Sequence, residues 1–454
     1  MTQCTQSSFE FKADYAREVV ARFDGGAISS DGGSLLLRQT DQRLNLLARF
    51  SGCFLDGREQ DRVEHSVLEM VSQRVYGLAL GYEDLNDHEQ LRKDPLFGVL
   101  AGREEFDQPL AGKSTLNRLE LGNGQQDRYK KITFWKQAVD ELLVSVFVES
   151  HEKSAEEIIL DIDTTDLPLH GKQEGRFFHG YYDHYCYLPL YVFCGEHVLC
   201  ARLRQSNSDA SAGSLVEIER IVDQIRGAWP TVRIILRSDS GFCRNELMSW
   251  CESKRVDYVF GLARNQRLRS IIGRQMWEAT EQWNRTGKPA RVFTEFAYQT
   301  RKTKTRGWDR ERRVVAKAEH IDGKENPRFV VTSLSPEQSA AQALYEELYC
   351  ARGNMENRIK EQFSLFADRV SAETMRANQL RLYFSVVAYV LVSGLRRLGL
   401  KATEFAQAQI STIRTKLLKI GAQVRVTVRK VWISMTSSYP WQSVYQRAWS
   451  NLRS

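Results

Sequence analysis

The amino-acid sequence predicts an α/β fold, and three observations lead to this prediction. Residues 1–150 mainly show the apolar spacing of amphipathic helices. Between residues 158 and 264, short runs rich in β-branched and aromatic residues alternate with helical patterns. From residue 341 onward the helical pattern returns. A chain of 454 residues is too long for one ordinary core, so we expect several structural units.

Residues 1–150 are predicted to form a helical region. Its helices are expected at residues 30–50, 59–81, 112–120 and 125–147. Helices of this kind either bind a partner or act as scaffold, and the sequence leaves both alternatives open. The N-terminal residues contain no apolar signal core, so no secretion signal is expected.

Residues 151–264 are predicted to form the first part of an α/β core. The expected order is three strands, a helix, a strand, a helix and a strand. The expected elements are strand 158–163, an antiparallel pair at 180–195 and 197–205 with its turn at 194–196, helix 211–229, strand 232–242, helix 244–256 and strand 257–264.

Three further regions complete the chain. Residues 265–340 carry strand patterns and are expected to form a β-rich insertion. The next region, residues 341–372, contains most of a strong helix predicted over 339–363. Residues 373–454 are expected to form a basic helical region, with helices at 374–398 and 404–420, one strand and a short final helix. The apolar stretch 382–395 is too short to span a bilayer, so we expect a buried helix and no membrane insertion.

Positive charge is concentrated in two segments of the chain. The net charge is +7, but residues 376–454 hold thirteen Lys and Arg against one acid, Glu404. A second basic cluster, residues 299–313, contains seven bases and two acids. Basic segments with nearby aromatic residues suit a nucleic-acid backbone and stacked bases, and a solvated basic surface is the alternative for each. The eight cysteines include no C-x-x-C pair, so we expect reduced thiols, as in a cytosolic protein, rather than zinc ligands or disulfides.

Carboxylates follow two of the predicted strands. In the stretch "IILDIDTTDLPLHG", Asp161 and Asp163 point to the same face because alternate residues of a strand share a face. Asp166 lies past the Thr pair and is expected to be a loop residue. In "IILRSDSGF", Asp239 follows a second apolar strand and precedes Ser-Gly. If the strand order is as predicted, Asp163 and Asp239 lie on neighbouring strands.

A third carboxylate lies on the helix predicted over 339–363. Tyr349, Arg352 and Glu356 are spaced at i, i+3 and i+7, which places them on one helical face. Arg and Tyr can bind a phosphate, and Glu can hold a cation. Converged carboxylates repel one another, and Mg²⁺ relieves this repulsion. Two such ions about 4 Å apart support phosphodiester cleavage and transfer.

The chain resembles the DDE transposases of bacterial insertion sequences, in the subgroup with a Tyr-Arg-Glu-Lys signature. The resemblance covers residues 20 to 450 and rests on the segments "LDIDTTDLPLHG", "GYYDHYCYLPLYVFCG", "RSDSGF", "YCARGNMENRIKE" and "STIRTKLLKIGAQVRVTVRK". It implies an RNase H-like catalytic core, in which the first and fourth strands lie side by side. The predicted order of strands and helices resembles that fold.

The resemblance implies that Asp163, Asp239 and Glu356 are the catalytic residues and hold Mg²⁺ or Mn²⁺, two ions when DNA is bound. Asp163 directly precedes Thr, as the family motif requires, and Asp161 is the alternative ligand two residues earlier. The signature Lys does not match, because Phe363 stands at its position. Either Lys360, one turn after the Glu, substitutes for it, or this branch of the family has lost the contact.

The resemblance also implies a set of DNA-binding residues. Tyr349 and Arg352 match the residues of the signature that contact phosphate. An aromatic residue of the insertion is expected to hold a flipped base, with Trp308 as the first candidate and Trp277 and Trp283 behind it; a tryptophan packed in the core of the insertion is the alternative for each. The bases expected to contact DNA beside Lys360 are Arg301, Lys302, Lys304 and Arg306.

We therefore expect a transposase that cleaves DNA at terminal inverted repeats in a metal-dependent reaction and transfers the strand into target DNA through hairpin ends. Residues 1–150 are expected to bind DNA ends, and residues 373–454 to bind DNA and dimerise. The family implies a homodimer in a synaptic complex, acting in the bacterial cytoplasm at the nucleoid. An RNase H-like nuclease or junction resolvase, and a non-catalytic DNA-binding descendant, are the alternatives.

Overall fold

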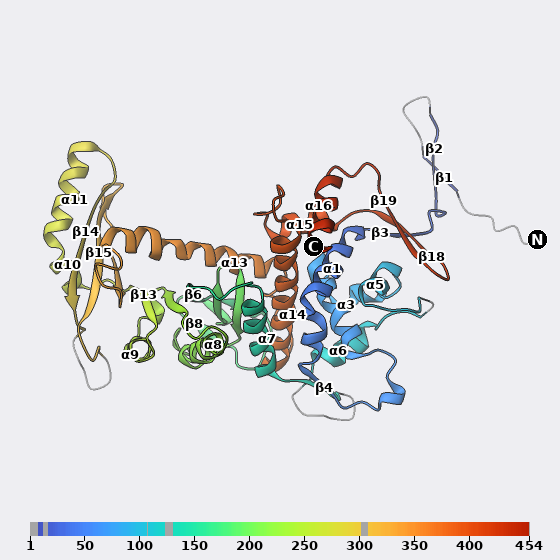
Figure 1. The fold of residues 1–454 in the computed structure, drawn as a ribbon, viewed down its shortest axis with the longest axis horizontal. Coiled ribbons are helices and arrows are strands. Elements are labelled where there is room, and N and C mark those ends of the chain that lie inside the picture. The colour runs from blue at the N-terminus through green and yellow to red at the C-terminus, as the bar shows by residue number, and fades with distance from the viewer. Residues whose placement is uncertain (1–7, 12–16, 107, 123–129, 301–306, 454) are drawn as a thin grey trace, which may run out of the picture. The chain divides into compact units, whose positions relative to one another are not determined.

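The structure is a computed structural model that describes residues 8–11, 17–106, 108–122, 130–300 and 307–453 (Figure 1). The chain divides into two compact units. One contains Met1–Trp135, Glu361–Ala367 and Tyr383–Ser454, and the other contains Lys136–Lys360 and Asp368–Leu382. We describe each unit by itself and refer to them as the first and the second unit.

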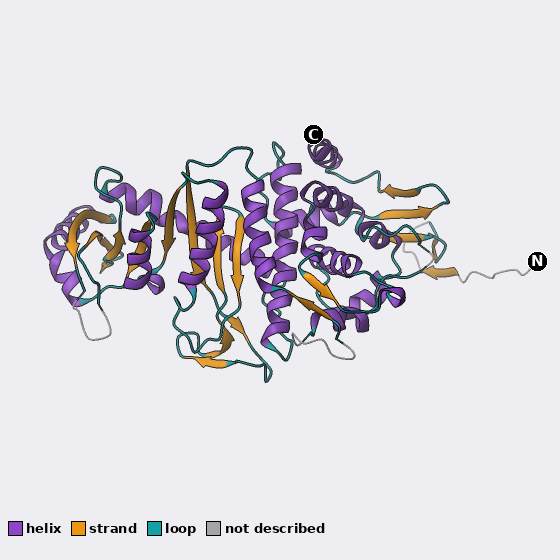
Figure 2. Cartoon of the chain, turned by 60° about the horizontal axis from the view of Figure 1, so that its bottom comes forward, coloured by secondary structure: helices purple, strands orange, loops and turns teal. Residues whose placement is uncertain are grey.

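The second unit is built on one large mixed sheet, which confirms the predicted α/β class (Figure 2). Its strands lie in the order β11-β10-β6-β12-β13-β17-β15-β14, with β16 beside β15. The strand bounds are β6 Glu157–Thr164, β10 Leu190–Cys194, β11 His197–Arg202, β12 Arg233–Ser238, β13 Asp257–Leu262, β14 Ala290–Tyr298, β15 Arg312–Ile321, β16 Lys324–Glu325 and β17 Arg328–Thr332.

The pairing within this sheet follows the predicted strand order. β10 and β11 form the expected antiparallel hairpin, and Cys194 pairs with His197 across its turn. β6 lies between β10, with which it is antiparallel, and β12, with which it is parallel. The first and the fourth strand of the predicted order are therefore neighbours. β12 and β13 are also parallel.

The strands of residues 265–340 extend this same sheet instead of forming a separate one. β17 pairs antiparallel with β13, and β15 and β14 continue outward from it. Helices α10 Gln266–Ile271 and α11 Gly273–Thr286 precede these strands, and α11 packs on β14 and β15. A continuous ladder of backbone hydrogen bonds thus joins the insertion to the core.

Apolar side chains fill both faces of the sheet of the second unit. Ile158, Leu160 and Ile162 of β6 belong to the larger core, which also includes residues of α7 Lys136–Glu149, α8 Ser214–Ala228 and α9 Asn245–Ser253. Ile235 of β12 belongs to a second core on the opposite face, together with Leu344 and Tyr345. Because side chains alternate along a strand, Asp161 and Asp163 point to the face of this second core.

The helix predicted over 339–363 is not one regular α-helix. It consists of α12 Ala341–Ala343, a π-helical turn Leu344–Tyr349, a 3-10 turn Cys350–Arg352 and α13 Gly353–Phe363. The change of hydrogen-bonding pattern falls beside Tyr349 and Arg352. π-turns inside helices are common at functional sites.

The first unit is mainly helical. Its helices are α1 Leu35–Leu44, α2 Leu46–Ser51, α3 Val67–Leu80, α4 His88–Leu91, α5 Pro95–Leu100, α6 Lys113–Glu120, α15 Ile410–Ile413 and α16 Gln442–Arg453, with short helical turns at Gly32–Ser34, Gln60–Arg62, Leu85–Asp87, Leu395–Gly399 and Arg414–Leu418. Its strands form the pairs β1 Ser8–Phe11 with β2 Val19–Arg22 and β4 Phe54–Asp56 with β5 Ile132–Phe134, and a sheet of β3 Ala27–Ser29, β18 Ala422–Val426 and β19 Val431–Met435.

Several other predicted elements differ from the observed ones. The strand expected over 180–195 is divided into β9 His184–Tyr187 and β10, which belong to different sheets. The α-helix expected over 59–81 begins at Val67, and the one expected over 404–420 begins at Ile410. The helix expected over 125–147 is observed as α7, beginning at Lys136, because residues 132–134 pair with β4 instead. The single strand expected near residue 424 is a hairpin of two strands, β18 and β19.

The long apolar helix predicted near residue 382 is present and buried. Among the described residues, one helical stretch, Met375–Gly399, is long and apolar enough to cross a membrane by length and composition. However, 89% of its most apolar window is buried inside the protein, as in the core helix of a soluble protein. The first part of this stretch is α14, Met375–Gly394.

Candidate active site

Two aspartates lie side by side where two neighbouring strands of the large sheet end. In the parallel pair of β6 and β12, Ile162 is the partner of Ser238. Asp163 and Asp239 are the residues that follow these two, so they occupy equivalent positions at the ends of adjacent strands. The prediction that these two aspartates are on neighbouring strands is confirmed.

Asp163 lies in a largely buried position with a cation beside it. Its Oδ1 accepts a hydrogen bond of 2.9 Å from the backbone N–H of Thr164, and its Oδ2 lies 2.8 Å from Nη1 of Arg352. Burial raises the pKa of the Asp163 carboxyl to about 6, and the neighbouring carboxylate of Asp239 acts in the same direction, although Arg352 counteracts both. The site therefore holds an acid whose ionised form is poorly solvated.

Asp239 caps the short turn that follows β12. Its Oδ1 accepts a hydrogen bond of 2.8 Å from the backbone N–H of Gly241, in the turn Ser240–Phe242. A Cβ added at Gly241 would lie 3.0 Å from that same oxygen, so the glycine keeps room for the carboxylate. The Ser-Gly pair after the acid thus fixes the direction of the carboxylate.

Tyr349 approaches the site over a glycine of the neighbouring strand. A Cβ added at Gly261 of β13 would lie only 2.5 Å from the hydroxyl of Tyr349 and 3.0 Å from the backbone nitrogen of Ser240. Glycine is therefore required at this position of the strand. Burial raises the pKa of the Tyr349 hydroxyl, and Asp239 adds to this effect while Arg352 opposes it. The phenol is a neutral hydrogen-bond donor beside the carboxylates.

Arg352 connects the first aspartate with the glutamate. Its Nη1 contacts Asp163 at 2.8 Å, and its Nη2 lies 3.5 Å from Oε1 of Glu356. The side chain of Glu356 is 54% exposed, whereas that of Asp163 is 13% exposed. The structure thus brings Tyr349 and Arg352 to the two aspartates, and the guanidinium of Arg352 lies between Asp163 and Glu356.

Asp161, the alternative ligand, is bound by an arginine. Nε and Nη2 of Arg237 donate to its two carboxylate oxygens at 2.6 and 2.8 Å. Burial raises the pKa of the Asp161 carboxyl, although Arg237 lowers it. Nη1 of Arg237 also donates to the backbone carbonyl of Leu348 at 2.5 Å, so the pair ties β6 and β12 to the π-helical turn that carries Tyr349.

Arg237 is not identified as a residue of the site from the sequence, although the sequence contains a pattern that indicates its pairing with Asp161. Asp161 stands two residues before Asp163, and Arg237 stands two residues before Asp239, so each belongs to the same strand face as a site aspartate. The parallel register pairs Arg237 with Asp161. An acid and a base at equivalent positions of adjacent strands predict a cross-strand ion pair.

The two adjacent aspartates fit a divalent cation. Both supply hard oxygen ligands, and the repulsion between them is the kind that Mg²⁺ or Mn²⁺ relieves. Within the described part of the chain, no group of three His, Cys, Asp or Glu residues is arranged to hold a metal ion. Glu356 is held away from the aspartates by Arg352, so the third carboxylate does not share their position in this structure.

The remaining predicted site residues lie in varied surroundings. Lys360 is exposed on α13, and Phe363 is half-buried near its end. Trp308 is 4% exposed and belongs to the core of the second unit, where it packs on Tyr298. Trp277 is 65% exposed on α11, and the ring of Trp283 lies 4.8 Å from that of His320. The predicted DNA-contacting bases at 301, 302, 304 and 306 lie outside the described residues.

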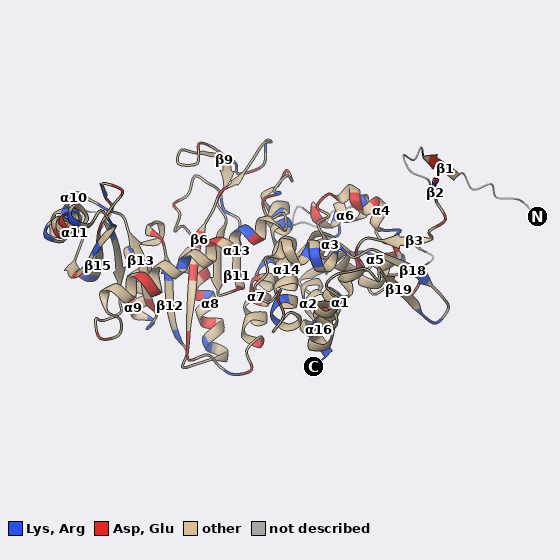
Figure 3. Cartoon of the chain, turned by 90° about the horizontal axis from the view of Figure 1, so that it is seen from above, with Lys and Arg blue, Asp and Glu red and all other residues tan. Residues whose placement is uncertain are grey.

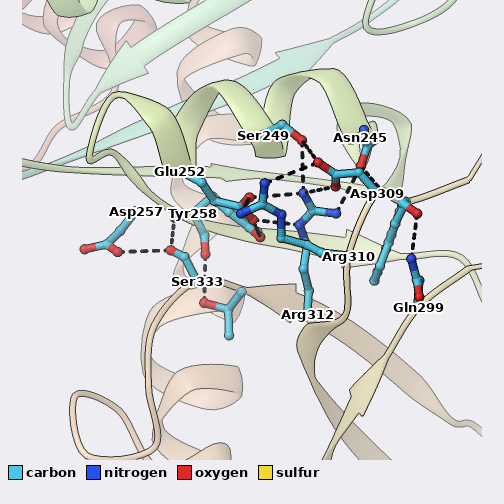
Figure 4. Close-up of polar contacts among 12 residues, drawn as sticks. Asn245, Ser249, Glu252, Asp257, Tyr258, Gln299, Asp309, Arg310, Arg312 and Ser333 are labelled. Carbon is cyan, nitrogen blue, oxygen red and sulfur yellow. Dashed lines mark hydrogen bonds and ion pairs between the residues drawn. The ribbon is translucent and has the colours of Figure 1, made fainter.

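The second half of the basic cluster at 299–313 faces acids of the protein (Figure 4). Arg312 binds Glu252 of α9 through two contacts, at 2.7 and 3.1 Å, and Asp309 at 2.9 Å. Arg310 lies 3.4 Å from Glu252, and Arg313 binds Glu295. Arg310 and Arg312 bind the insertion to α9, and Arg313 is paired within the insertion. The number of positive charges in this cluster therefore overstates how many are available to bind a phosphate.

An exposed aromatic hairpin leaves the same end of β6. β7 Leu167–Pro168, β8 Phe177–His179 and β9 His184–Tyr187 form a small sheet directly after the first aspartate. Its exposed aromatic side chains are Phe177, Phe178, Tyr181 and Tyr185. In the sequence, the run "RFFHGYYDHY" indicates these exposed aromatic residues. A turn-rich segment with so many aromatic residues contains more than a small core can bury.

Comparisons with known proteins identify the family. No curated protein matches the sequence. Among solved structures, one similar chain is described as "Cryo-EM structure of piggyBac transposase synaptic complex with hairpin DNA (SNHP)", with 10% identity and a TM-score of 0.40 over 86% of this chain and 80% of that chain. The sequence model described as "Transposase DDE domain group 1" matches residues 11–454. Because this match covers nearly the entire chain, the protein belongs to the transposase DDE domain family.

Proposed function

We propose that the chain is the transposase of a bacterial insertion sequence of the Tyr-Arg-Glu-Lys subgroup, with an RNase H-like core. It would cleave DNA at terminal inverted repeats and transfer the strand into target DNA in a cut-and-paste reaction through hairpin ends. The observation that carries the proposal is the position of Asp163 and Asp239 on adjacent parallel strands, facing Tyr349 and Arg352. The neighbouring first and fourth strands support the RNase H-like core.

Each group has a distinct task in this proposal. Asp163 and Asp239 hold the divalent cations, two Mg²⁺ or Mn²⁺ with DNA bound, and Glu356 completes the ligand set. When bound, these ions activate the attacking water or 3′-hydroxyl and stabilise the leaving oxygen. Arg352 and Tyr349 donate to the scissile phosphate, for which a planar guanidinium and a neutral phenol are suited. Arg352 then exchanges a carboxylate partner for a phosphate.

The proposal extends to partners and location. We infer a homodimer that holds two double-stranded DNA ends in a synaptic complex, working at the nucleoid in the cytoplasm. The proposal includes the predicted roles of two regions. Residues 1–150 would bind DNA ends, and residues 373–454 would bind DNA or dimerise. The absence of acids after Glu404 supports a role of that tail on DNA.

Replacement of the glutamate tests the function. Glu356→Gln should abolish strand cleavage and strand transfer while the binding of inverted-repeat DNA is largely kept, because one carboxylate ligand is lost without a change of size. Glu347→Gln is the matched control, since Glu347 is an exposed glutamate of the same helical segment. Cleavage is measured on duplexes copied from the DNA that flanks the reading frame, with Mg²⁺ or Mn²⁺.

Three outcomes would count against the proposal. Undiminished cleavage by Glu356→Gln would remove this residue from the active site. Cleavage of branched junctions in preference to inverted-repeat ends would identify a resolvase on the same fold. DNA binding by the unaltered protein without cleavage under any of these conditions would identify a non-catalytic descendant.

A further inference from the structure

A small sheet of the first unit presents one apolar and one polar face. β18 pairs with β19 on one side and with β3 on the other. Ala422 and Val424 are buried, whereas Gln423 and Arg425, which alternate with them, are exposed. The face of Ala422 and Val424 therefore packs against the first unit, although Val426 at its end is 42% exposed. The opposite face points to solvent and also carries Ile28 of β3, which pairs with Gln423 and is 67% exposed.

The solvent face of the β18–β19 ribbon combines cations with an exposed indole. Arg425 is the cross-strand partner of Trp432, which is 48% exposed. The guanidinium carbon of Arg425 lies 5.9 Å from the centre of the indole ring of Trp432, and Nζ of Lys430 lies 5.4 Å from it. These cations flank a flat aromatic surface, an arrangement that suits a polyanion with stacked bases.

The tip of the ribbon is closed by hydrogen bonds and carries a solvated apolar residue. The backbone N–H of Thr427 donates to the carbonyl of Lys430 at 2.9 Å, and the N–H of Lys430 donates to Oγ1 of Thr427 at 3.1 Å. Val428 and Arg429 stand between them, and Val428 is fully exposed at 103%. A valine at the tip of a closed turn has no structural task in the first unit.

Charge selects the kind of partner that this ribbon fits. No Asp or Glu occurs in the sequence after Glu404, whereas the ribbon contributes Arg425, Arg429 and Lys430 (Figure 3). An acidic partner is therefore required. Among acidic partners, duplex DNA offers phosphates on both sides of a groove, and its major groove is wide enough for a two-stranded β-ribbon.

We propose that the β18–β19 ribbon enters the major groove of duplex DNA, with Arg425, Arg429 and Lys430 on phosphates and Val428 against base edges. The inference rests on the proposed function, because it presumes DNA as the substrate. It specifies which element of residues 373–454 contacts DNA and which groove that element enters, whereas the role proposed above for this region rests only on its net charge. The valine can contact thymine methyl groups, so the tip contributes to sequence preference.

Removal of the ribbon charges tests the phosphate contacts. The triple variant Arg425→Gln, Arg429→Gln and Lys430→Gln should bind inverted-repeat duplex more weakly. The slope of log affinity against log salt should fall in magnitude by about 2 to 3, because each phosphate contact contributes about 0.9. The control triple carries the same charge change at exposed positions of the same tail, which are Lys401, Arg447 and Arg453.

A substitution at the tip tests the groove contact. Val428→Ser should leave the unfolding temperature unchanged, because the side chain is fully exposed, and should reduce the preference for inverted-repeat duplex over an unrelated duplex. Protection of guanine N7 from dimethyl sulfate reports the major groove directly. It should be present with the unaltered protein and lost with the ribbon triple.

The proposal is overturned if the ribbon triple loses no more affinity and salt slope than the control triple, or if guanine N7 is not protected. Its failure differs from failure of the proposed function. A ribbon triple with unchanged DNA binding, together with an inactive Glu356→Gln, removes the ribbon proposal only. An unaltered protein that binds no duplex DNA removes both.

Discussion

Replacement of Arg237 distinguishes the contribution of this residue to the stability of the fold from its contribution to the geometry of the active site. The side chains of Arg237 and Asp161 are 7% and 8% exposed, so Arg237→Gln leaves a buried carboxylate without its two charged hydrogen bonds. Removal of one partner of a buried ion pair costs about 3–5 kcal/mol. The double variant Arg237→Gln with Asp161→Asn leaves no buried charge, so it should recover most of this loss in the free energy of unfolding.

Cleavage should not recover in the double variant. The contact of 2.5 Å between Nη1 of Arg237 and the carbonyl of Leu348 holds the turn that ends at Tyr349, and a glutamine is too short to replace it. Displacement of catalytic groups by about 1 Å costs about 100-fold in rate. We therefore expect about 100-fold slower single-turnover cleavage at saturating DNA, with stability close to that of the unaltered protein.

Two measurements decide this prediction. Urea unfolding gives the stability, and cleavage is measured per folded molecule with DNA and Mg²⁺ in excess. Arg202→Gln is the control, because it breaks a buried ion pair with Asp140 elsewhere in the same unit and should lower stability without slowing cleavage. A double Arg237 and Asp161 variant that cleaves within a few-fold of the unaltered protein would refute the positioning role.

Three further predictions concern the site and the insertion. The pKa of Asp163 is raised from 3.8 to about 6 in the folded protein, so ionisation of this carboxyl destabilises the fold progressively between these two pH values and fully above them. Asp163→Asn in EDTA should therefore raise the free energy of unfolding by about 3 kcal/mol at pH 8 and by little at pH 4, and a gain that grows toward low pH would contradict this. Gly261→Ala should displace Tyr349 and slow cleavage at least 10-fold. Gly227→Ala is the control and should not slow cleavage, because its added Cβ meets open space. Equal cleavage rates for the two variants would contradict this prediction. Trp308→Ala should lower stability in urea by about 3–5 kcal/mol, because the indole is part of the core, and an unchanged urea midpoint would argue that it serves DNA alone.

The sequence predicts the parts of the site that depend on strand order and alternation. The adjacency of β6 and β12 is implied by the resemblance of the order of strands and helices to an RNase H-like fold, and the turn at Cys194 follows from its Gly. The break in the helix at Leu344–Tyr349 does not, because apolar periodicity is almost the same in a π-turn and in an α-helix. What fixes the break is a contact from Arg237, more than a hundred positions earlier in the chain.

Two other features depend on partners that no local pattern shows. Arg312 counts as a DNA-binding charge by composition, but its acid Glu252 lies on a helix 60 positions away. The two strands of the C-terminal ribbon read as one, because the run "VRVTVRKVW" alternates through the turn without Gly, Pro, Asn or Asp. The local sequence determines which helices and strands form. Contacts between residues far apart in the sequence determine which charged side chains remain available to bind a partner.

The unbroken sheet of the second unit has a mechanical consequence. Four strand spacings separate β12, which Asp239 directly follows, from β14 at the far side of the insertion. At about 4.8 Å each they amount to about 19 Å along the sheet. An insertion joined by a flexible linker would sample many distances from the carboxylates, whereas this one is held at a fixed distance by backbone hydrogen bonds. The sheet thus fixes the distance between the insertion and the two aspartates. For the proposed transposase, a DNA contact on the insertion would fall at a set number of nucleotides from the point of cleavage.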